Sequence, residues 1–303
     1  MKVVIAGGAG SLGRRIAADL SSRGDEVVIL TRSPRPALAY RQVRWDGRTV
    51  GDWATELAGA VLVNLAGEVV DRRPTPANVE LLRRSRVEPT TALAAAAAQL
   101  DVPPTVWIQA STLAIYGDAG DAVLDESSPP ADGPPQMAGV ARAWEEAAVT
   151  APSTRQVVLR TGIVLDRDSP ALDRLAGLVR WGLGGRIASG RQWVSWIHIA
   201  DFLAVIRRVQ HDPSLHGIVH VTSPNPVRNA ELMAALRKVM HRPPAPPTPA
   251  ALVRMGAVVL RTDPALALTG RRCIPARLSE AGFSFAYPTV DEALADLLGP
   301  RSA

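Results

Sequence analysis

Apolar residues gather in short runs along the first half of the chain, and helix-like stretches separate these runs. The runs predict five buried strands, one directly before Gly7 and four over residues 26–31, 61–67, 105–111 and 156–161. The separating stretches predict helices over roughly residues 10–24, 75–100 and 136–149. Strands that alternate with helices pair in parallel, so the pattern predicts an α/β fold with a Rossmann-like doubly wound parallel sheet.

The alternation loosens beyond residue 165. There the pattern predicts a helix over 200–211, a strand over 216–222, a helix over 229–241 and a proline-rich linker over 243–249. We therefore expect a dinucleotide-binding domain and a smaller, interleaved C-terminal substrate domain. The first covers residues 1–165, completed by parts of 194–225, and the second covers 166–303 with a terminal module at about 245–299.

A glycine-rich turn follows the first strand at once and leads into the first predicted helix. Its residues are Gly7, Gly10, Ser11, Leu12 and Gly13. A strand, a glycine turn and a helix in this order let the backbone approach a pyrophosphate and direct a helix N-terminus at its charge. The turn therefore predicts dinucleotide binding.

Arg32 directly follows the second predicted strand, and this position indicates which dinucleotide binds. An acidic residue there suits the ribose 2′-hydroxyl of NAD, whereas an arginine suits the 2′-phosphate of NADP. Thr31 and Ser33 can donate hydrogen bonds to the same phosphate, and Arg14 and Arg35 add positive charge. The alternative is that Arg32 is a solvated loop residue. We predict NADP(H) as the cofactor.

Composition excludes several other classes of protein. The chain has 303 residues, is 47% apolar and carries 34 basic against 29 acidic residues, a net charge of +5. The basic residues are scattered, which argues against a nucleic-acid surface. Cys273 is the only cysteine, so neither an internal disulfide nor a cysteine-built zinc site is expected. No apolar stretch reaches the roughly 18 charge-free residues that a membrane span needs. The apolar run at the N-terminus is too short for a signal peptide. We therefore expect a cytoplasmic protein without a metal site or membrane contact.

Several ordered motifs together resemble a known family. They are the glycine turn, Asn64-Leu-Ala-Gly67-Glu68, Ala110-Ser-Thr-Leu-Ala-Ile-Tyr116-Gly117, Trp196-Ile-His198-Ile-Ala-Asp201 and Gly282-Phe-Ser-Phe-Ala-Tyr-Pro288. The chain is similar to extended short-chain dehydrogenase/reductases, and more narrowly to the atypical branch known as predicted nucleoside-diphosphate-sugar epimerases. The resemblance implies an NADP-binding Rossmann domain, a small C-terminal substrate domain and a homodimer through helices 75–100 and 136–149.

The resemblance also implies further cofactor contacts. They fall on Ala66 and Gly67 at the end of the strand over 61–67, and Glu68 and Arg86 are expected to face the same cleft. Turn chemistry at Gly67 and surface pairing of Glu68 with Arg86 are the alternatives.

The catalytic residues of the wider superfamily are a Ser or Thr, a Tyr and a Lys, the last two spaced as Tyr-x-x-x-Lys. Spacing back from Tyr116 places Thr112 at the hydroxyl position, with Ser111 beside it. The Tyr-x-x-x-Lys pair is due within residues 136–141, where the chain reads Gln-Met-Ala-Gly-Val-Ala. The usual proton donor is therefore missing. Tyr116 is the nearest replacement, and it is equally a packing residue of its turn.

Candidate substrate contacts follow a glycine-rich stretch in the second half of the chain. They are Arg191, Trp193, Trp196 and His198. Aromatic walls with a few polar anchors suit a small, partly apolar substrate. The alternative for the tryptophans is a place in the core, and for His198 a hydrogen-bonded core position.

Three functions are consistent with these features. The leading interpretation is an NADP(H)-dependent oxidoreductase that moves a hydride to or from a carbonyl, an imine or an activated alkene. A nucleotide-sugar epimerase or dehydratase would need a base that the chain does not visibly provide, and tightly held NAD, which Arg32 opposes. A non-catalytic NADP(H) sensor would keep the Rossmann half and dispense with the catalytic residues.

Overall fold

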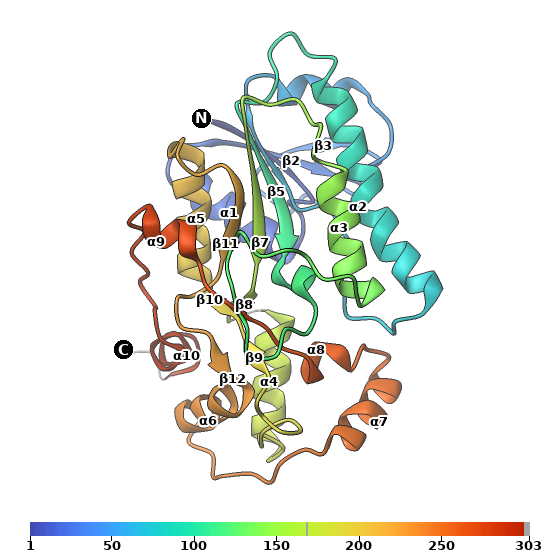
Figure 1. The fold of residues 1–303 in the computed structure, drawn as a ribbon. Coiled ribbons are helices and arrows are strands. Elements are labelled where there is room, and N and C mark those ends of the chain that lie inside the picture. The colour runs from blue at the N-terminus through green and yellow to red at the C-terminus, as the bar shows by residue number, and fades with distance from the viewer. Residues whose placement is uncertain (168, 300–303) are drawn as a thin grey trace.

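A seven-stranded parallel sheet forms the centre of the computed structural model, which describes residues 1–167 and 169–299 (Figure 1). Its strand order is β11-β7-β5-β4-β1-β2-β3. In chain order the strands are β1 (Lys2–Ala6), β2 (Glu26–Thr31), β3 (Arg41–Arg44), β4 (Val61–Asn64), β5 (Val106–Thr112), β7 (Arg155–Thr161) and β11 (Gly217–Val221). The predicted Rossmann-like doubly wound sheet is thus confirmed.

Helices cover both faces of this sheet (Figure 1). Helices α1 (Ser11–Ser21) and α5 (Ile199–His211) pack on one face, and α2 (Pro76–Ala97) and α3 (Val140–Glu146) lie side by side on the other. Successive strand residues point to opposite faces, so Val3 and Ile5 pack towards α1 while Val4 and Ala6 pack towards α2. Because both faces are covered, the central strands β1, β2 and β4 are nearly continuous apolar runs. The homodimer expected through α2 and α3 stays a prediction.

Local sequence explains where the helices begin. Thr75 caps α2 by accepting a hydrogen bond from the N–H of Asn78, and Pro76 occupies the first turn, where its missing N–H costs nothing. The helix predicted over 136–149 begins instead with a π-helical turn over Pro135–Gly139 and continues as α3. The strand predicted over 61–67 ends at Asn64, and its last residues form a loop.

The second half of the chain forms a smaller layer below the sheet and also returns to it (Figure 1). Helix α5 packs beside α1, and β11 adds the outermost strand next to β7. The helices of the lower layer are α4 (Pro170–Arg180), α6 (Asn229–Val239), α7 (Ala250–Leu260), α8 (Ala265–Leu268) and α10 (Val290–Leu298), whereas α9 (Ala276–Glu280) packs against β11. Leu172, Leu236 and Leu294 join α4, α6 and α10 in a separate hydrophobic core.

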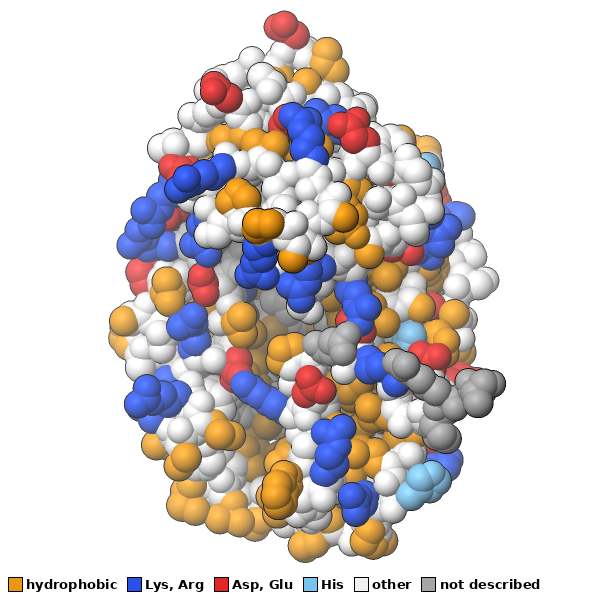
Figure 2. Space-filling model, turned by 180° about the vertical axis from the view of Figure 1, so that it is seen from behind, with side chains coloured by type: hydrophobic (Ala, Val, Ile, Leu, Met, Phe, Trp, Pro, Cys, Tyr) orange, Lys and Arg blue, Asp and Glu red, His pale blue; other side chains and the backbone are white. Residues whose placement is uncertain are grey.

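Three short strand pairs connect the two layers. β8 (Ile163–Leu165) pairs with β10 (Trp196–His198), β9 (Trp193–Val194) with β12 (Val227–Arg228), and β6 (Val123–Leu124) with β13 (Arg272–Cys273). Seen from behind, the surface is hollowed near its middle, and basic side chains surround the hollow (Figure 2). Within residues 1–167 and 169–299, no helix has the length and apolarity to cross a membrane.

Truncation of the sheet core is expected to destabilise the protein strongly. Leu62 is fully buried between the sheet and α2, so Leu62→Ala should lower the free energy of unfolding by about 2–5 kcal/mol through lost burial and the cavity left behind. Urea denaturation measures this change. Val69→Ala is the matched control, because this side chain is 69% exposed and its loss should cost less than about 0.5 kcal/mol. Equal losses in both variants would contradict the structure.

Candidate functional site

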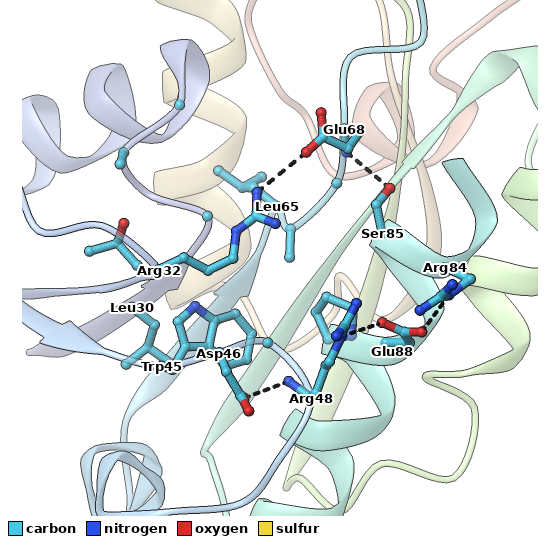
Figure 3. A pocket seen from close by; sticks show the side chains of 18 of the residues that line it. Leu30, Arg32, Trp45, Asp46, Arg48, Leu65, Glu68, Arg84, Ser85 and Glu88 are labelled. Carbon is cyan, nitrogen blue, oxygen red and sulfur yellow. Dashed lines mark hydrogen bonds and ion pairs between the residues drawn. The ribbon is translucent and has the colours of Figure 1, made fainter. Parts of the chain in front are cut away.

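A cavity of about 860 Å³ lies at the carboxyl ends of β1, β2 and β4 (Figure 3). The sheet order changes direction at β1, which has β4 on one side and β2 on the other. Ligands of open α/β sheets bind at such a point. The cavity is lined by seven of the residues predicted from the sequence to hold the cofactor: Gly7, Gly10, Arg32, Ser33, Ala66, Gly67 and Glu68.

The glycine turn brings three segments of backbone close together. Gly7 has a φ of +79°, and a Cβ there would lie 3.0 Å from the carbonyl oxygen of Leu65. A Cβ on Gly13 would lie 2.5 Å from the Cα of Gly8, so only glycine lets α1 start so near the turn. No side chain caps α1 at Gly10, which leaves the helix N-terminus available to an anion. These features fit a dinucleotide pyrophosphate.

Arg32 lies at the mouth of the cavity, with 72% of its side chain exposed. Its guanidinium lies 3.3 Å from a carboxylate oxygen of Glu68 (Figure 3). The other carboxylate oxygen of Glu68 is 3.2 Å from Arg72. The N–H of Ser33 is 3.3 Å from the hydroxyl of Thr31, which also lines the cavity. Arginine, serine and threonine donors at this end of the cavity suit a phosphate.

The opposite wall consists of residues that sequence reasoning did not assign to the site. Trp45, Asp46 and Arg48 come from the loop after β3, and Arg84 and Glu88 come from α2. Glu88 accepts from Arg48 at 2.9 Å and from Arg84 at 2.7 Å, which joins the loop to the helix. Trp45 and Asp46 directly follow β3 in the sequence, but nothing local relates them to the glycine turn.

Two of these wall residues are held rigidly. The N–H of Thr49, its hydroxyl and the N–H of Arg48 donate to Asp46 and lower the pKa of its carboxyl to about 2, so it is anionic at neutral pH. Trp45 is buried and packs edge-on against Trp53, with ring centroids 5.2 Å apart. An aromatic wall of this kind suits a flat base.

Arg86 is located behind the cavity rather than in it. Its side chain is buried, contacts the ring of Trp144 at 5.1 Å, and donates to the carbonyl oxygen of Glu68 at 2.9 Å. Burial lowers its pKa to about 10, so it stays protonated at neutral pH. Arg86 therefore positions the loop that carries Gly67 and Glu68. Ser11, Leu12 and Gly13 likewise belong to the start of α1 beside the cavity.

The predicted catalytic hydroxyls lie at the end of β5 and face different surroundings. Thr112 is half-buried, and its hydroxyl oxygen accepts from the N–H of Ala114 at 3.1 Å. Ser111 is buried and donates to Glu145 of α3 at 2.5 Å. Thr112 is therefore the more accessible of the two.

Tyr116 belongs to a buried polar network. Arg160 donates to its hydroxyl oxygen at 2.7 Å and forms a two-point ion pair with Glu145. The hydroxyl lies 2.6 Å from Nε2 of His220, whose Nδ1 faces the carbonyl oxygen of Ile274 at 2.9 Å. This geometry makes Nδ1 the protonated nitrogen and Nε2 the acceptor. Burial raises the pKa of Tyr116 to about 12 and lowers the pKa of His220 to about 4. These surroundings favour the packing alternative for Tyr116 over the role of proton donor.

The structure corrects the expectation that Trp196 and His198 contact a substrate. Both side chains are buried because β10 pairs with β8 and directs them inward. Trp196 donates to the carbonyl oxygen of Asn225, while His198 accepts from the N–H of Ala200 and lies 3.2 Å from Asp296. Burial lowers the pKa of His198, so it is held as a neutral core histidine.

Trp193 and Arg191, the other predicted substrate contacts, are more accessible. The guanidinium groups of Arg228 and Arg272 both contact the ring of Trp193, at 3.9 and 4.7 Å from its centroid. Its indole N–H donates to Asp121, and the exposed Arg191 is 4.0 Å from the same carboxylate. Their contact with a substrate stays a prediction. Among the described residues, no cluster of acidic, histidine and cysteine side chains is arranged to hold a metal ion.

Comparisons with known proteins cover nearly the whole chain. Residues 3–139 match the NAD dependent epimerase/dehydratase family, and residues 248–297 match a domain of unknown function (DUF1731). The epimerase family protein SDR39U1 of Bos taurus is 33% identical over 98% of this chain and 100% of that protein. The epimerase family protein ML0860 of Mycobacterium leprae is 36% identical over 96% of this chain and 94% of that protein.

Two solved structures are also similar. Human SDR39U1, crystallised with NADPH, has a TM-score of 0.85 and 31% identity, and the match covers 98% of this chain and 99% of that one. A nucleoside-diphosphate sugar epimerase from Corynebacterium glutamicum has a TM-score of 0.79 and 32% identity, over 99% of this chain and 58% of that one.

The buried network is expected to make stability depend on pH. The pKa of His220 is about 4 in the folded protein against an ordinary 6.5, so between these values the unfolded chain binds a proton that the folded chain does not. This contribution to stability is fully present above pH 6.5 and is lost as the pH falls towards 4, by about 3 kcal/mol in total. Urea denaturation at pH 7 and 4.5 should show a smaller loss in His220→Gln than in the wild type. His241→Gln removes an exposed histidine and should lose as much stability between pH 7 and 4.5 as the wild type does. If His220→Gln also loses as much as the wild type, His220 is not the source of the pH dependence.

Proposed function

The chain belongs to the epimerase family of the SDR39U1 proteins, within the short-chain dehydrogenases/reductases, and from this premise we propose that it is an NADP(H)-dependent oxidoreductase of the atypical extended type. The observation that carries the proposal is the cavity in which the glycine turn, Arg32 and Ser33 meet. A pyrophosphate would lie against the turn at Gly7 and Gly10, and a 2′-phosphate against Arg32. The NADPH in the human relative supports the same choice of cofactor.

The chemistry that we propose for the site follows from the hydroxyl of Thr112 and from the missing Tyr-x-x-x-Lys pair. When bound, NADP(H) supplies or accepts a hydride. Thr112 would orient the substrate oxygen or nitrogen, while Glu145 holds Ser111 in place beneath it. A positioned acid or base contributes about 10²–10⁴-fold to a rate, and residues 136–141 offer none. A water would supply the proton, so the site suits a carbonyl, imine or activated alkene that needs little acid assistance.

A non-catalytic NADP(H) sensor is the second candidate. The observation that favours it is that Tyr116, the nearest replacement for the missing proton donor, is fixed between Arg160 and His220. A nucleotide-sugar epimerase or dehydratase is less favoured, although the Corynebacterium relative is named a nucleoside-diphosphate sugar epimerase. It would need a base at the sugar and tightly held NAD, which Arg32 opposes.

Cofactor choice can be measured directly. Energy transfer from tryptophan to the nicotinamide should report tight binding of NADPH and weak binding of NADH. Arg32→Ala should weaken NADPH about ten- to hundredfold by removing a charge-assisted hydrogen bond, and should leave NADH unchanged. Arg83→Ala is the matched control, because this exposed arginine pairs with Glu80 and does not line the cavity. Unchanged NADPH affinity in Arg32→Ala would refute the assignment.

Catalysis needs a separate test. We expect the wild type to oxidise NADPH with at least one member of a panel of ketones, imines and activated alkenes. Thr112→Val should then lower kcat/KM roughly a hundredfold without changing NADPH affinity, while Thr112→Ser should keep most of the activity because it keeps the hydroxyl. NADPH binding without turnover on any compound would favour the sensor.

A further inference from the structure

Glu68 occupies a position between two arginines that belong to different parts of the site. Its carboxylate lies 3.3 Å from Arg32, at the mouth of the cavity (Figure 3), and its other oxygen lies 3.2 Å from Arg72, in the loop that follows. Its backbone is fixed, since its N–H donates to Ser85 and its carbonyl oxygen accepts from Arg86. Only the carboxylate can therefore change partner.

We propose that Glu68 is a specificity-determining residue that competes with the cofactor's 2′-phosphate for Arg32. This inference rests on the proposed NADP(H) binding. A dinucleotide with a 2′-phosphate must take the guanidinium of Arg32 from Glu68, whereas one with a 2′-hydroxyl leaves the ion pair intact. The carboxylate thus lowers the affinity for NADP(H) and leaves the affinity for NAD(H) unchanged.

The cost of this exchange is limited by the surroundings of the pair. Arg32 is 72% and Glu68 30% exposed in their side chains, and ion pairs so open to water are weak. The displaced carboxylate also keeps Arg72 as a partner, so no charge is left alone. A phosphate, with more charge and three oxygens, therefore displaces Glu68 readily.

The loop that receives the carboxylate is itself held in place. Gln136 donates to the carbonyl oxygen of Arg72 at 2.9 Å. Asp71 is bound by Thr262 and by Arg174, both from the lower layer. Arg72 is thus a fixed alternative partner for Glu68.

The other carboxylates around the cavity are engaged elsewhere. Glu88 pairs with Arg48 and Arg84, Glu80 pairs with Arg83, and Asp46 accepts from its own turn. Glu80 lines the same cavity without contacting Arg32. Its replacement by glutamine is therefore a matched control for the loss of one negative charge.

Calorimetric titration of the full chain tests the competition. The ligands are 2′,5′-ADP and 5′-AMP, which share the adenosine and differ in the 2′-phosphate, followed by NADPH and NADH. We expect Glu68→Gln to bind 2′,5′-ADP and NADPH about two- to fivefold more tightly than the wild type, with 5′-AMP and NADH unchanged. Glu80→Gln should leave the ratio between the two ligand classes as it is.

A double-mutant cycle localises the effect. In an Arg32→Ala background, Glu68→Gln should no longer change the affinity for 2′,5′-ADP, because the contested guanidinium is gone. Where Arg32 is kept, weaker or unchanged binding of 2′,5′-ADP by Glu68→Gln would overturn the proposal. The variant Glu68→Ala checks that the new glutamine itself makes no contact with the ligand. A wild type that prefers NADPH while Glu68→Gln shows no gain would refute this inference alone. A wild type without that preference would refute the proposed cofactor as well.

Discussion

The close approach of backbone at the end of β1 is the constraint on which the rest of the site depends. Gly7 allows the turn to come within van der Waals contact of the loop after β4, and Gly13 allows α1 to begin directly beside Gly8. With these contacts, the cavity has a floor of peptide groups rather than side chains. Any larger residue would push α1 away from the sheet, and the helix N-terminus would no longer face the ligand.

Charge is distributed around this cavity in pairs. Arg48 and Arg84 share Glu88, and Arg32 and Arg72 share Glu68. An anionic cofactor therefore enters a site in which these four arginines already have partners. The affinity of the cofactor depends on which of these ion pairs it can break. Arg32 has the most exposed side chain of the four, and an ion pair so open to water is weak.

The buried network below the candidate catalytic strand is arranged differently. Ser111, Glu145, Arg160, Tyr116 and His220 satisfy one another inside the protein. A network of this kind fixes the end of β5 and orients Thr112, but it leaves no group free to exchange protons with a substrate. The missing Tyr-x-x-x-Lys pair is thus not replaced by its nearest tyrosine, which agrees with a substrate that needs little acid assistance or with a sensor.

The sequence by itself determined the parallel sheet, the glycine turn and the position of Arg32 directly after β2. Each of these is encoded locally, in apolar runs such as 26–31 and 156–161 and in residues that directly follow a strand. The edge strand β3 escaped detection because Arg41–Arg44 contains no apolar run. Only the tertiary structure decided that Arg48 and Glu88, 40 residues apart, meet in one wall, and that Trp196 and His198 point into the core. Contacts between distant segments and the direction of a side chain depend on how whole elements pack, and no local pattern specifies that packing.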